Sequence, residues 1–200
     1  MSYHKFLLEK ILNKKYEGIN MDLRSILLSD NVVESISENI DYLLQIIPEI
    51  KYMIGFEHKH PHHHLDVWNH TLLALSLSEN DFDIRLCLLL HDIGKPFSYQ
   101  DKEIRHFKNH PMVSAKMSEE ILYRLGYDEE YIKLICYLIA NHDTLISSKQ
   151  IDNNYELCLK LYEIQRCDAL AHHPDKLEKR IEYLSKTKEK LLTKGDNKNE

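Results

Sequence analysis

The sequence predicts an all-α protein, and three observations support this class. The chain of 200 residues contains only five glycines and five prolines and is rich in leucine, isoleucine, glutamate and lysine, a composition that favours helices. Apolar residues recur at steps of three and four along nearly every segment, which is the period of an amphipathic helix. No segment shows a strand pattern. The length is that of one domain with a substantial core.

Several segments have this helical period. They lie at residues 3–14, 32–47, 67–75, 83–94, 110–125, 129–140, 154–171 and 175–194. Asp66 and Asp128 are the expected N-caps of the helices that follow them, and Pro111 suits the first turn of its helix. Pro48 and Gly126 are expected to end the helices that precede them.

This order suggests one helical domain with an added piece at each end. We assign residues 1–50 to N-terminal helices that pack on the core, 51–174 to the domain core, 175–194 to an amphipathic C-terminal helix, and 195–200 to a disordered tail. The apolar face of the C-terminal helix could either complete the core or join two copies of the chain. The oligomeric state is therefore left open.

Charge and cysteine content argue against several classes of protein. The chain has 26 basic and 32 acidic residues, and its formal charge of -6 does not favour a general nucleic-acid coat, although a local basic cleft is compatible with it. Four cysteines without a CxxC pair are typical of reduced thiols in a cytosolic protein. The N-terminus is too polar for a signal peptide, and no apolar run approaches the ~20 residues of a membrane span. We expect a cytoplasmic protein with no membrane segment.

The most informative feature is the pair His91 and Asp92, which follows the apolar run LCLLL. An unpaired carboxylate is costly at the end of a buried helix, so the pair indicates a bound cation. Further residues of ligand type are His70, His106, His110, His142 and Asp168. Imidazole and carboxylate ligands without matching cysteines favour Mn, Fe, Co, Ni, Mg or a catalytic Zn over a structural zinc site.

Four of these residues carry a resemblance to a known family. Their order, His70…His91-Asp92…Asp168, resembles the H…HD…D signature of the HD-domain metal-dependent phosphohydrolases, and HDIGKP, HPMVSA and RCDALA resemble further elements of that family. Four longer segments are similar to the HD domain of bacterial CCA-adding tRNA nucleotidyltransferases. They are IIPEIKYMIGF, HHHLDVWNHTL, HFKNHPMVSAKMSEEIL and LIANHD, within residues 20–172. The Gly-Ser pair and paired-aspartate strand of the nucleotidyltransferase part are absent, so we expect a stand-alone module.

The resemblance implies an HD-domain helical bundle with a metal site in its interior. The residues that match the ligands of the principal metal are His70, His91, Asp92 and Asp168. In family members with two ions Asp92 would bridge them, and the matching ligands of the second ion are His110 and His142. The positions expected near the substrate are His63, His64 and His106.

The activity that the resemblance implies is hydrolysis of a phosphoester by a water molecule activated on the metal. Asp92 and Lys95 would be the catalytic residues, and Lys95 would neutralise charge that develops on the phosphoryl oxygens. The substrate would be a phosphomonoester or phosphodiester, such as a nucleotide, a 2',3'-cyclic phosphate or an RNA 3' end. The cofactor would be one or two divalent ions among Mn, Fe, Ni, Co, Mg and Zn.

Other interpretations stay open. His110 and His142 could stand at helix ends without binding metal, and Lys95 could offset a helix dipole. The cluster of His58, His60, His62, His63 and His64 favours adventitious nickel or zinc binding over a native site, and its role is left open. The same metal ligands would also serve a di-iron oxygenase on this fold. They would serve equally a non-catalytic module that binds a nucleotide, tRNA or a partner.

Overall fold

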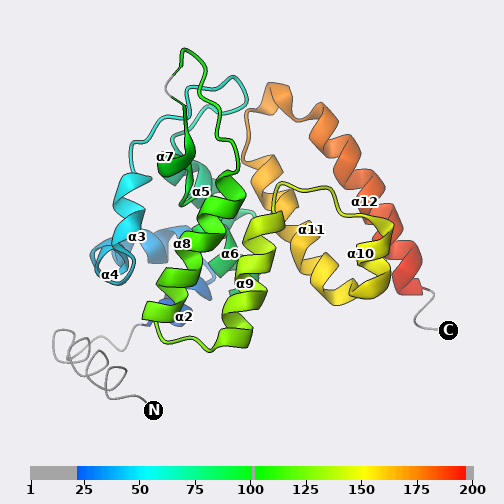
Figure 1. Ribbon diagram of the computed structural model, residues 1–200, viewed down its shortest axis with the longest axis horizontal. Coiled ribbons are helices and arrows are strands. Elements are labelled where there is room, and N and C mark those ends of the chain that lie inside the picture. The colour runs from blue at the N-terminus through cyan, green and yellow to red at the C-terminus, as the bar shows by residue number, and fades with distance from the viewer. Residues whose placement is uncertain (1–21, 101, 197–200) are drawn as a thin grey trace.

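Helices form every regular element in the computed structural model, which describes residues 22–100 and 102–196 (Figure 1). The α-helices are α2 (Leu23–Leu27), α3 (Val32–Glu38), α4 (Ile40–Ile46), α5 (Val67–Ser76), α6 (Phe82–Leu90), α7 (Lys95–Ser98), α8 (His110–Arg124), α9 (Glu129–Asn141), α10 (Ser148–Asn153), α11 (Tyr155–Leu170) and α12 (Glu178–Asp196). Short 3-10 helices lie at Pro48–Tyr52 and Pro174–Lys176. Within the described ranges the only β contacts are two isolated bridges. The predicted all-α class is confirmed, and the helix expected at 3–14 lies outside the described residues.

Side-chain caps explain where these helices begin. Asp66 and Asp128 each accept a hydrogen bond from the backbone N–H three residues further on, at 2.7 and 2.9 Å, as predicted. α6 begins one residue earlier than the predicted 83–94 because Asp81 caps it, accepting from the N–H of Ile84 at 3.0 Å. The ammonium of Lys160 lies 2.8 Å from Asp81 and 2.9 Å from Asp83, so it pairs with both carboxylates.

Two local signals change the predicted helix pattern. The segment 32–47 forms two helices that break at Asn39, whose side-chain amide donates to the carbonyl of Ser35 at 2.8 Å. An asparagine in this position competes with the helical hydrogen bonds of the backbone. Ser147 and Gln150 form a capping box that begins α10, a helix the apolar periodicity did not indicate.

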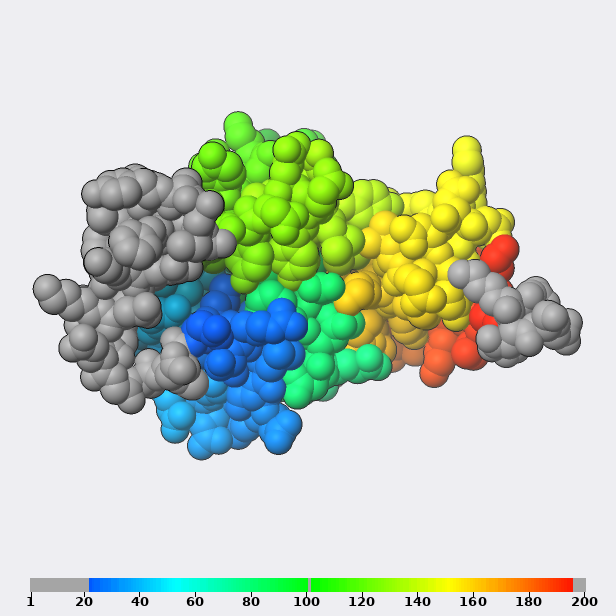
Figure 2. Space-filling model, turned by 90° about the horizontal axis from the view of Figure 1, so that it is seen from below, coloured from blue at the N-terminus to red at the C-terminus, as the bar shows by residue number. Residues whose placement is uncertain are grey.

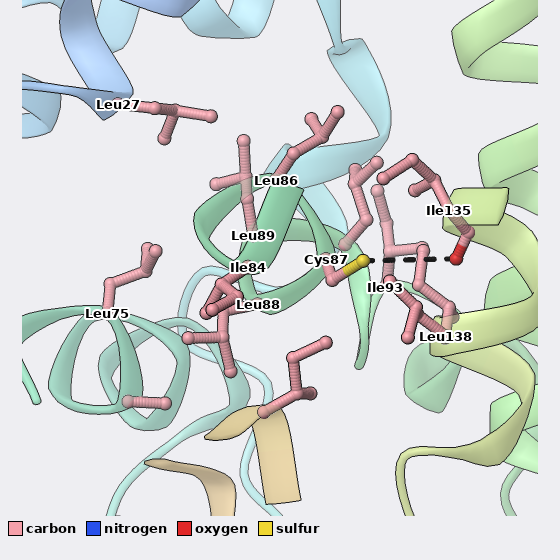
Figure 3. Close-up of a cluster of buried hydrophobic side chains, with 14 of the residues drawn as sticks. Leu27, Leu75, Ile84, Leu86, Cys87, Leu88, Leu89, Ile93, Ile135 and Leu138 are labelled. Carbon is pink, nitrogen blue, oxygen red and sulfur yellow. Dashed lines mark hydrogen bonds between the residues drawn. The ribbon is translucent and has the colours of Figure 1, made fainter. Parts of the chain in front are cut away.

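α6 is the centre of the fold. Apart from Asp83 and Arg85 it is apolar, and it contacts α2, α5, α8, α9 and α11. Figure 3 shows Leu86, Leu88 and Leu89 of this helix within the buried cluster, where Cys87 lies beside the carbonyl of Ile135 on α9. α6 ends at Leu90, earlier than predicted, because the chain then enters tight turns. The residues that follow Leu90 therefore lie at the end of the most enclosed helix.

α12 covers one end of the bundle. It packs on α10 and α11, and Figure 2 shows its red surface beside their yellow one. Leu184, Thr187 and Leu191 are buried in this contact. Part of its apolar face therefore completes the core of the same chain.

Two further expectations concerned reduced cysteines and the lack of a membrane segment. All four cysteines are free thiols, as predicted. Among the residues that the structure describes, none of the helices has both the length and the apolar character that a membrane crossing requires.

Candidate metal centre

Five helices bring the predicted metal ligands to one interior region. α5 carries His70, α6 is followed by His91 and Asp92, α8 begins at His110, α9 is followed by His142, and α11 carries Asp168. All of them are buried except His110, which is half-buried. Most lie at helix ends, so small changes in helix length or packing would separate them.

The four ligand histidines are oriented by the backbone. Nδ1 of His91, His142 and His110 lies 2.7, 2.7 and 3.0 Å from the carbonyl oxygen three residues earlier, and Nδ1 of His70 lies 3.2 Å from the carbonyl of Ala171. A carbonyl only accepts hydrogen bonds, so each Nδ1 is assigned the proton. Once the ring has lost its second proton, each Nε2 presents a lone pair, which is the arrangement that second-layer partners give to metal-binding histidines.

The first cluster consists of His70, His91 and Asp168. Asp168 Oδ1 lies 2.9 Å from Nε2 of His70 and 3.6 Å from Nε2 of His91. Arg180 of α12 lies 3.5 Å from the other oxygen, Oδ2, and so leaves Oδ1 facing the imidazoles. Burial alone would raise the pKa of Asp168, but the positive charges available from His172 and His70 hold it well below its usual range. Asp168 is therefore an ionised carboxylate in a buried site.

The second cluster consists of Asp92, His110 and His142. Asp92 Oδ1 lies 3.4 Å from Nε2 of His110 and 4.0 Å from Nε2 of His142. Its other oxygen, Oδ2, lies 3.2 Å from Nε2 of His91 and 3.7 Å from Nε2 of His70, in the first cluster. Asp92 thus presents one oxygen to each cluster, as a bridging ligand does.

The polar atoms of both clusters fit a divalent cation. Nε2 of His91 and Oδ1 of Asp92 are buried without a hydrogen-bond partner, and the charge of Asp92 Oδ2 is met within the chain by the Lys95 ammonium, 2.7 Å away. Nε2 of His110 and Nε2 of His142 lie only 3.2 Å apart, so their lone pairs face each other unless positive charge lies between them. Burial alone would lower the pKa of His91, but Asp92 and Asp168 raise it to about 10, so the site attracts positive charge. Such groups take up a metal ion readily when they lose their protons.

Lys95 lies against the centre and is held from two sides. Its Nζ is 2.7 Å from Asp92 Oδ2 and 3.1 Å from Nε2 of His58. His58 Nδ1 lies 2.9 Å from the carbonyl of Leu65, so its Nε2 is free to accept from the ammonium. Burial, together with the Lys95 charge, lowers the pKa of His58 to about 2. His58 is therefore not a surface residue available for adventitious metal binding, because it is buried and both of its ring nitrogens are engaged.

The residues expected near the substrate divide into two groups. His63 stacks on His58 with ring centroids 3.7 Å apart, and it lines a cavity of about 180 Å³ beside the clusters together with His106. His64 is exposed and does not line that cavity. Its ring centroid lies 5.4 Å from that of His173. Two of the three expected residues thus border the site.

Two residues that lie beside the Asp168 carboxylate were missed at the sequence level. His172 follows α11, places Nδ1 2.8 Å from the carbonyl of Asp168 and lines the same cavity. Its place four residues after a predicted ligand was a usable signal. No sequence signal pointed to Arg180, because the helical period of α12 does not show which of its charged residues faces α11.

Gly94 fixes the distance between the turn after α6 and the first turns of α8. Its N–H donates to Ser114 Oγ at 2.9 Å, and a Cβ on Gly94 would lie 2.5 Å from the backbone nitrogen of Ser114. Only a glycine permits this approach. The contact joins the segments HDIGKP and HPMVSA and sets His110 beside Asp92.

Known proteins resemble the region that contains both clusters. A family model described as HD domain matches residues 62–184. The CC-adding tRNA nucleotidyltransferase of Thermus thermophilus is 29% identical over 136 residues, which cover 63% of this chain and 31% of that protein. The A-adding tRNA nucleotidyltransferase of Deinococcus radiodurans is 29% identical over 137 residues, which cover 64% of this chain and 31% of that protein. The Multifunctional CCA protein of a Janthinobacterium strain is 26% identical over 131 residues, which cover 64% of this chain and 30% of that protein. The chain thus spans less than a third of the length of these relatives.

Proposed function

Because the chain belongs to the HD domain family, a superfamily of metal-dependent phosphohydrolases, we propose that it hydrolyses a phosphomonoester or phosphodiester. One observation carries the proposal most directly. Four histidines fixed through Nδ1 direct their Nε2 atoms toward two buried carboxylates, and these atoms form two adjacent groups whose members lie within 4.8 Å of one another.

We assign the ligands as two overlapping sets. The first ion would be held by His70, His91, Asp92 and Asp168. The second ion would be held by Asp92, His110 and His142. A divalent ion among Mn, Fe, Ni, Co, Mg and Zn supplies Lewis acidity and lowers the pKa of a coordinated water to about 7.

The protein itself contributes positive charge. Lys95 is nearly buried beside Asp92, with its ammonium oriented by His58, and there it would neutralise charge on a phosphoryl oxygen. Arg105 and His106 add positive or hydrogen-bonding groups to the cavity lining. We propose Asp92 and Lys95 as the catalytic residues, and His63 and His106 as residues that border the substrate.

The substrate that we propose is a nucleotide or the 3' end of an RNA, including a 2',3'-cyclic phosphate. The names of the three relatives support this class, since two of them describe nucleotidyltransferases of tRNA. Free thiols in all four cysteines suit the cytoplasmic location that we propose with it.

Metal analysis coupled to an assay tests the proposal. Untagged protein would be examined by ICP-MS and then assayed on bis-p-nitrophenyl phosphate and 2',3'-cAMP with Mn, Ni, Co or Mg added. We expect near-stoichiometric metal and metal-dependent hydrolysis. Bound metal without hydrolysis of any ester would favour a non-catalytic module. Dominant iron with oxygen-dependent turnover would favour an oxygenase, and the absence of metal would overturn the ligand assignment.

Lys95→Ala is expected to lower kcat while metal content stays unchanged. Removing one preorganised electrostatic group from an active site commonly costs on the order of 10² in rate. Lys95 touches Asp92 through its ammonium but supplies no lone pair to a metal at neutral pH. Steady-state kinetics and ICP-MS on the same preparation check this, with the exposed Lys108→Ala as control. A wild-type rate in Lys95→Ala would show that Lys95 has only a structural role.

His142→Ala is expected to remove the second ion and keep the first. His142 lies 4.0 Å from Asp92 Oδ1 but belongs to the second cluster alone. Metal content should fall from two equivalents to one, as measured by ICP-MS after dialysis. The exposed His64→Ala serves as control. Loss of both ions, or of neither, would contradict two separable sites.

A further inference from the structure

A second cavity adjoins the metal centre on the side of α12. Its volume is about 240 Å³, and it lies between the segment after α9 and the helices α11 and α12. Its lining includes Thr144, Leu145, Gln165, Ala169, Tyr183 and Leu184. Leu145 is 69% exposed and lines this cavity, where a ligand could cover it.

The two cavities share a wall. His142, Asp143 and Arg180 line both of them. Arg180 is the cation of this wall, 3.5 Å from Asp168 Oδ2 and 3.7 Å from Asp143 Oδ1. The guanidinium of Arg180 therefore stands at the boundary between the two cavities.

The polar groups around the second cavity bond to one another. Gln165 Nε2 donates to the carbonyls of Asn141 and Thr144, at 3.1 and 2.7 Å. Its Oε1 accepts from the hydroxyl of Tyr183 at 3.1 Å, and that hydroxyl accepts from the N–H of Ile146 at 2.8 Å. The network holds the cavity wall in shape and occupies the polar atoms of Gln165 and Tyr183. The remaining lining combines apolar side chains and the tyrosine ring with the charged groups of Asp143, Lys179 and Arg180.

We propose that this second cavity binds the nucleobase of a nucleotide whose phosphate lies at the metal centre. The inference rests on the proposed function and names the part of the substrate that the metal ligands do not contact. A nucleobase is flat, and its faces stack on tyrosine rings and on guanidinium planes such as Tyr183 and Arg180 can offer. The hydrogen bonds of Gln165 preorganise this surface in the free protein, which reduces the conformational entropy lost on binding.

Binding of a matched pair of ligands tests the inference through affinity, measured within a time over which phosphorus-31 NMR shows that neither ligand is hydrolysed. AMP and ribose 5-phosphate share a phosphate and a ribose, and only AMP has a base. Isothermal titration of the metal-loaded protein should give AMP an affinity at least about tenfold higher, or about 1.4 kcal/mol. Thr144→Trp fills the cavity from an exposed position, and Leu145→Asp places a charge in it. Each should lower AMP affinity to that of ribose 5-phosphate and leave ribose 5-phosphate binding unchanged.

The outcomes separate this inference from the proposed function. Equal affinity for the two ligands, or AMP binding that neither variant changes, would overturn the nucleobase assignment and leave the phosphate site intact. If neither ligand binds, the phosphate site fails and the nucleobase assignment fails with it. Lys149→Trp is the control, because Lys149 is exposed and lies outside the lining, and it should bind AMP as the parent chain does.

Discussion

Asp92→Ala is expected to remove bound metal and phosphoester hydrolysis together. Asp92 is the one residue whose two carboxylate oxygens face different clusters, with Oδ2 3.2 Å from Nε2 of His91 and Oδ1 3.4 Å from Nε2 of His110. Its loss takes a charged ligand from both ions at once. Metal per chain should fall below about a tenth, and kcat should fall by at least about 10³, since a metal ion supplies most of the activation in such reactions.

A thermal measurement shows whether this loss is local. Without metal, Asp92 is a fully buried carboxylate paired only with Lys95 and neighbouring imidazoles, so its removal need not destabilise the metal-free protein. We expect Mn²⁺ to raise the Tm of the parent chain and to leave that of Asp92→Ala unchanged. Asp175→Ala, at an exposed site, is the control. A variant that keeps both metal and activity would refute the ligand assignment.

Gly94→Ala is expected to destabilise the fold and to displace the second metal site. The added Cβ would lie 2.5 Å from the backbone nitrogen of Ser114 and 2.9 Å from the carbonyl carbon of Val113. The neighbours are backbone atoms of α8, so the helix itself must move. Overpacking of this kind costs about 1–3 kcal/mol. Because His110 begins α8, its Nε2 would shift away from Asp92, and we expect the second equivalent of metal to be lost.

A double variant distinguishes a backbone clash from a lost hydrogen bond. Ser114→Ala removes the oxygen that accepts from the Gly94 N–H and should cost roughly 1 kcal/mol. Combining it with Gly94→Ala should restore little stability, because the backbone contact remains. Urea denaturation and ICP-MS on the three variants check both claims. Full recovery in the double variant would show that only the Ser114 side chain was in the way.

Local signals predicted much of the fold. Asp66 and Asp128 cap helices where the sequence indicated, because a cap depends on residues within one turn. The break at Asn39 and the start of α6 at Asp81 were missed, although both are also local. Asp81 and Asp83 are both acidic residues able to cap α6, and Lys160 pairs with both of them, so the choice of Asp81 could not be read from residue type.

The sequence indicated which residues gather in the two clusters, but not what surrounds them. The sequence order identified His91 and Asp92 because a carboxylate after a buried helix needs a cation. The same reasoning could not separate His58 from His64, which lie in one loop. His58 is buried against Lys95, 37 residues away in sequence, and His64 is exposed. Burial and long-range contact decide such cases, and neither is encoded in spacing.

The bonds between ligand Nδ1 atoms and nearby carbonyls also bear on where the chain can gain or lose residues. One residue inserted into α6 would turn its end by about 100° and advance it by about 1.5 Å. The bond from His91 to the carbonyl of Leu88 would survive intact, yet Nε2 would point elsewhere. Insertions and deletions are therefore excluded from α6 and from the last turn of α9. They are best tolerated at 125–128, the connection between α8 and α9, which joins those helices at the ends away from His110 and His142 (Figure 1).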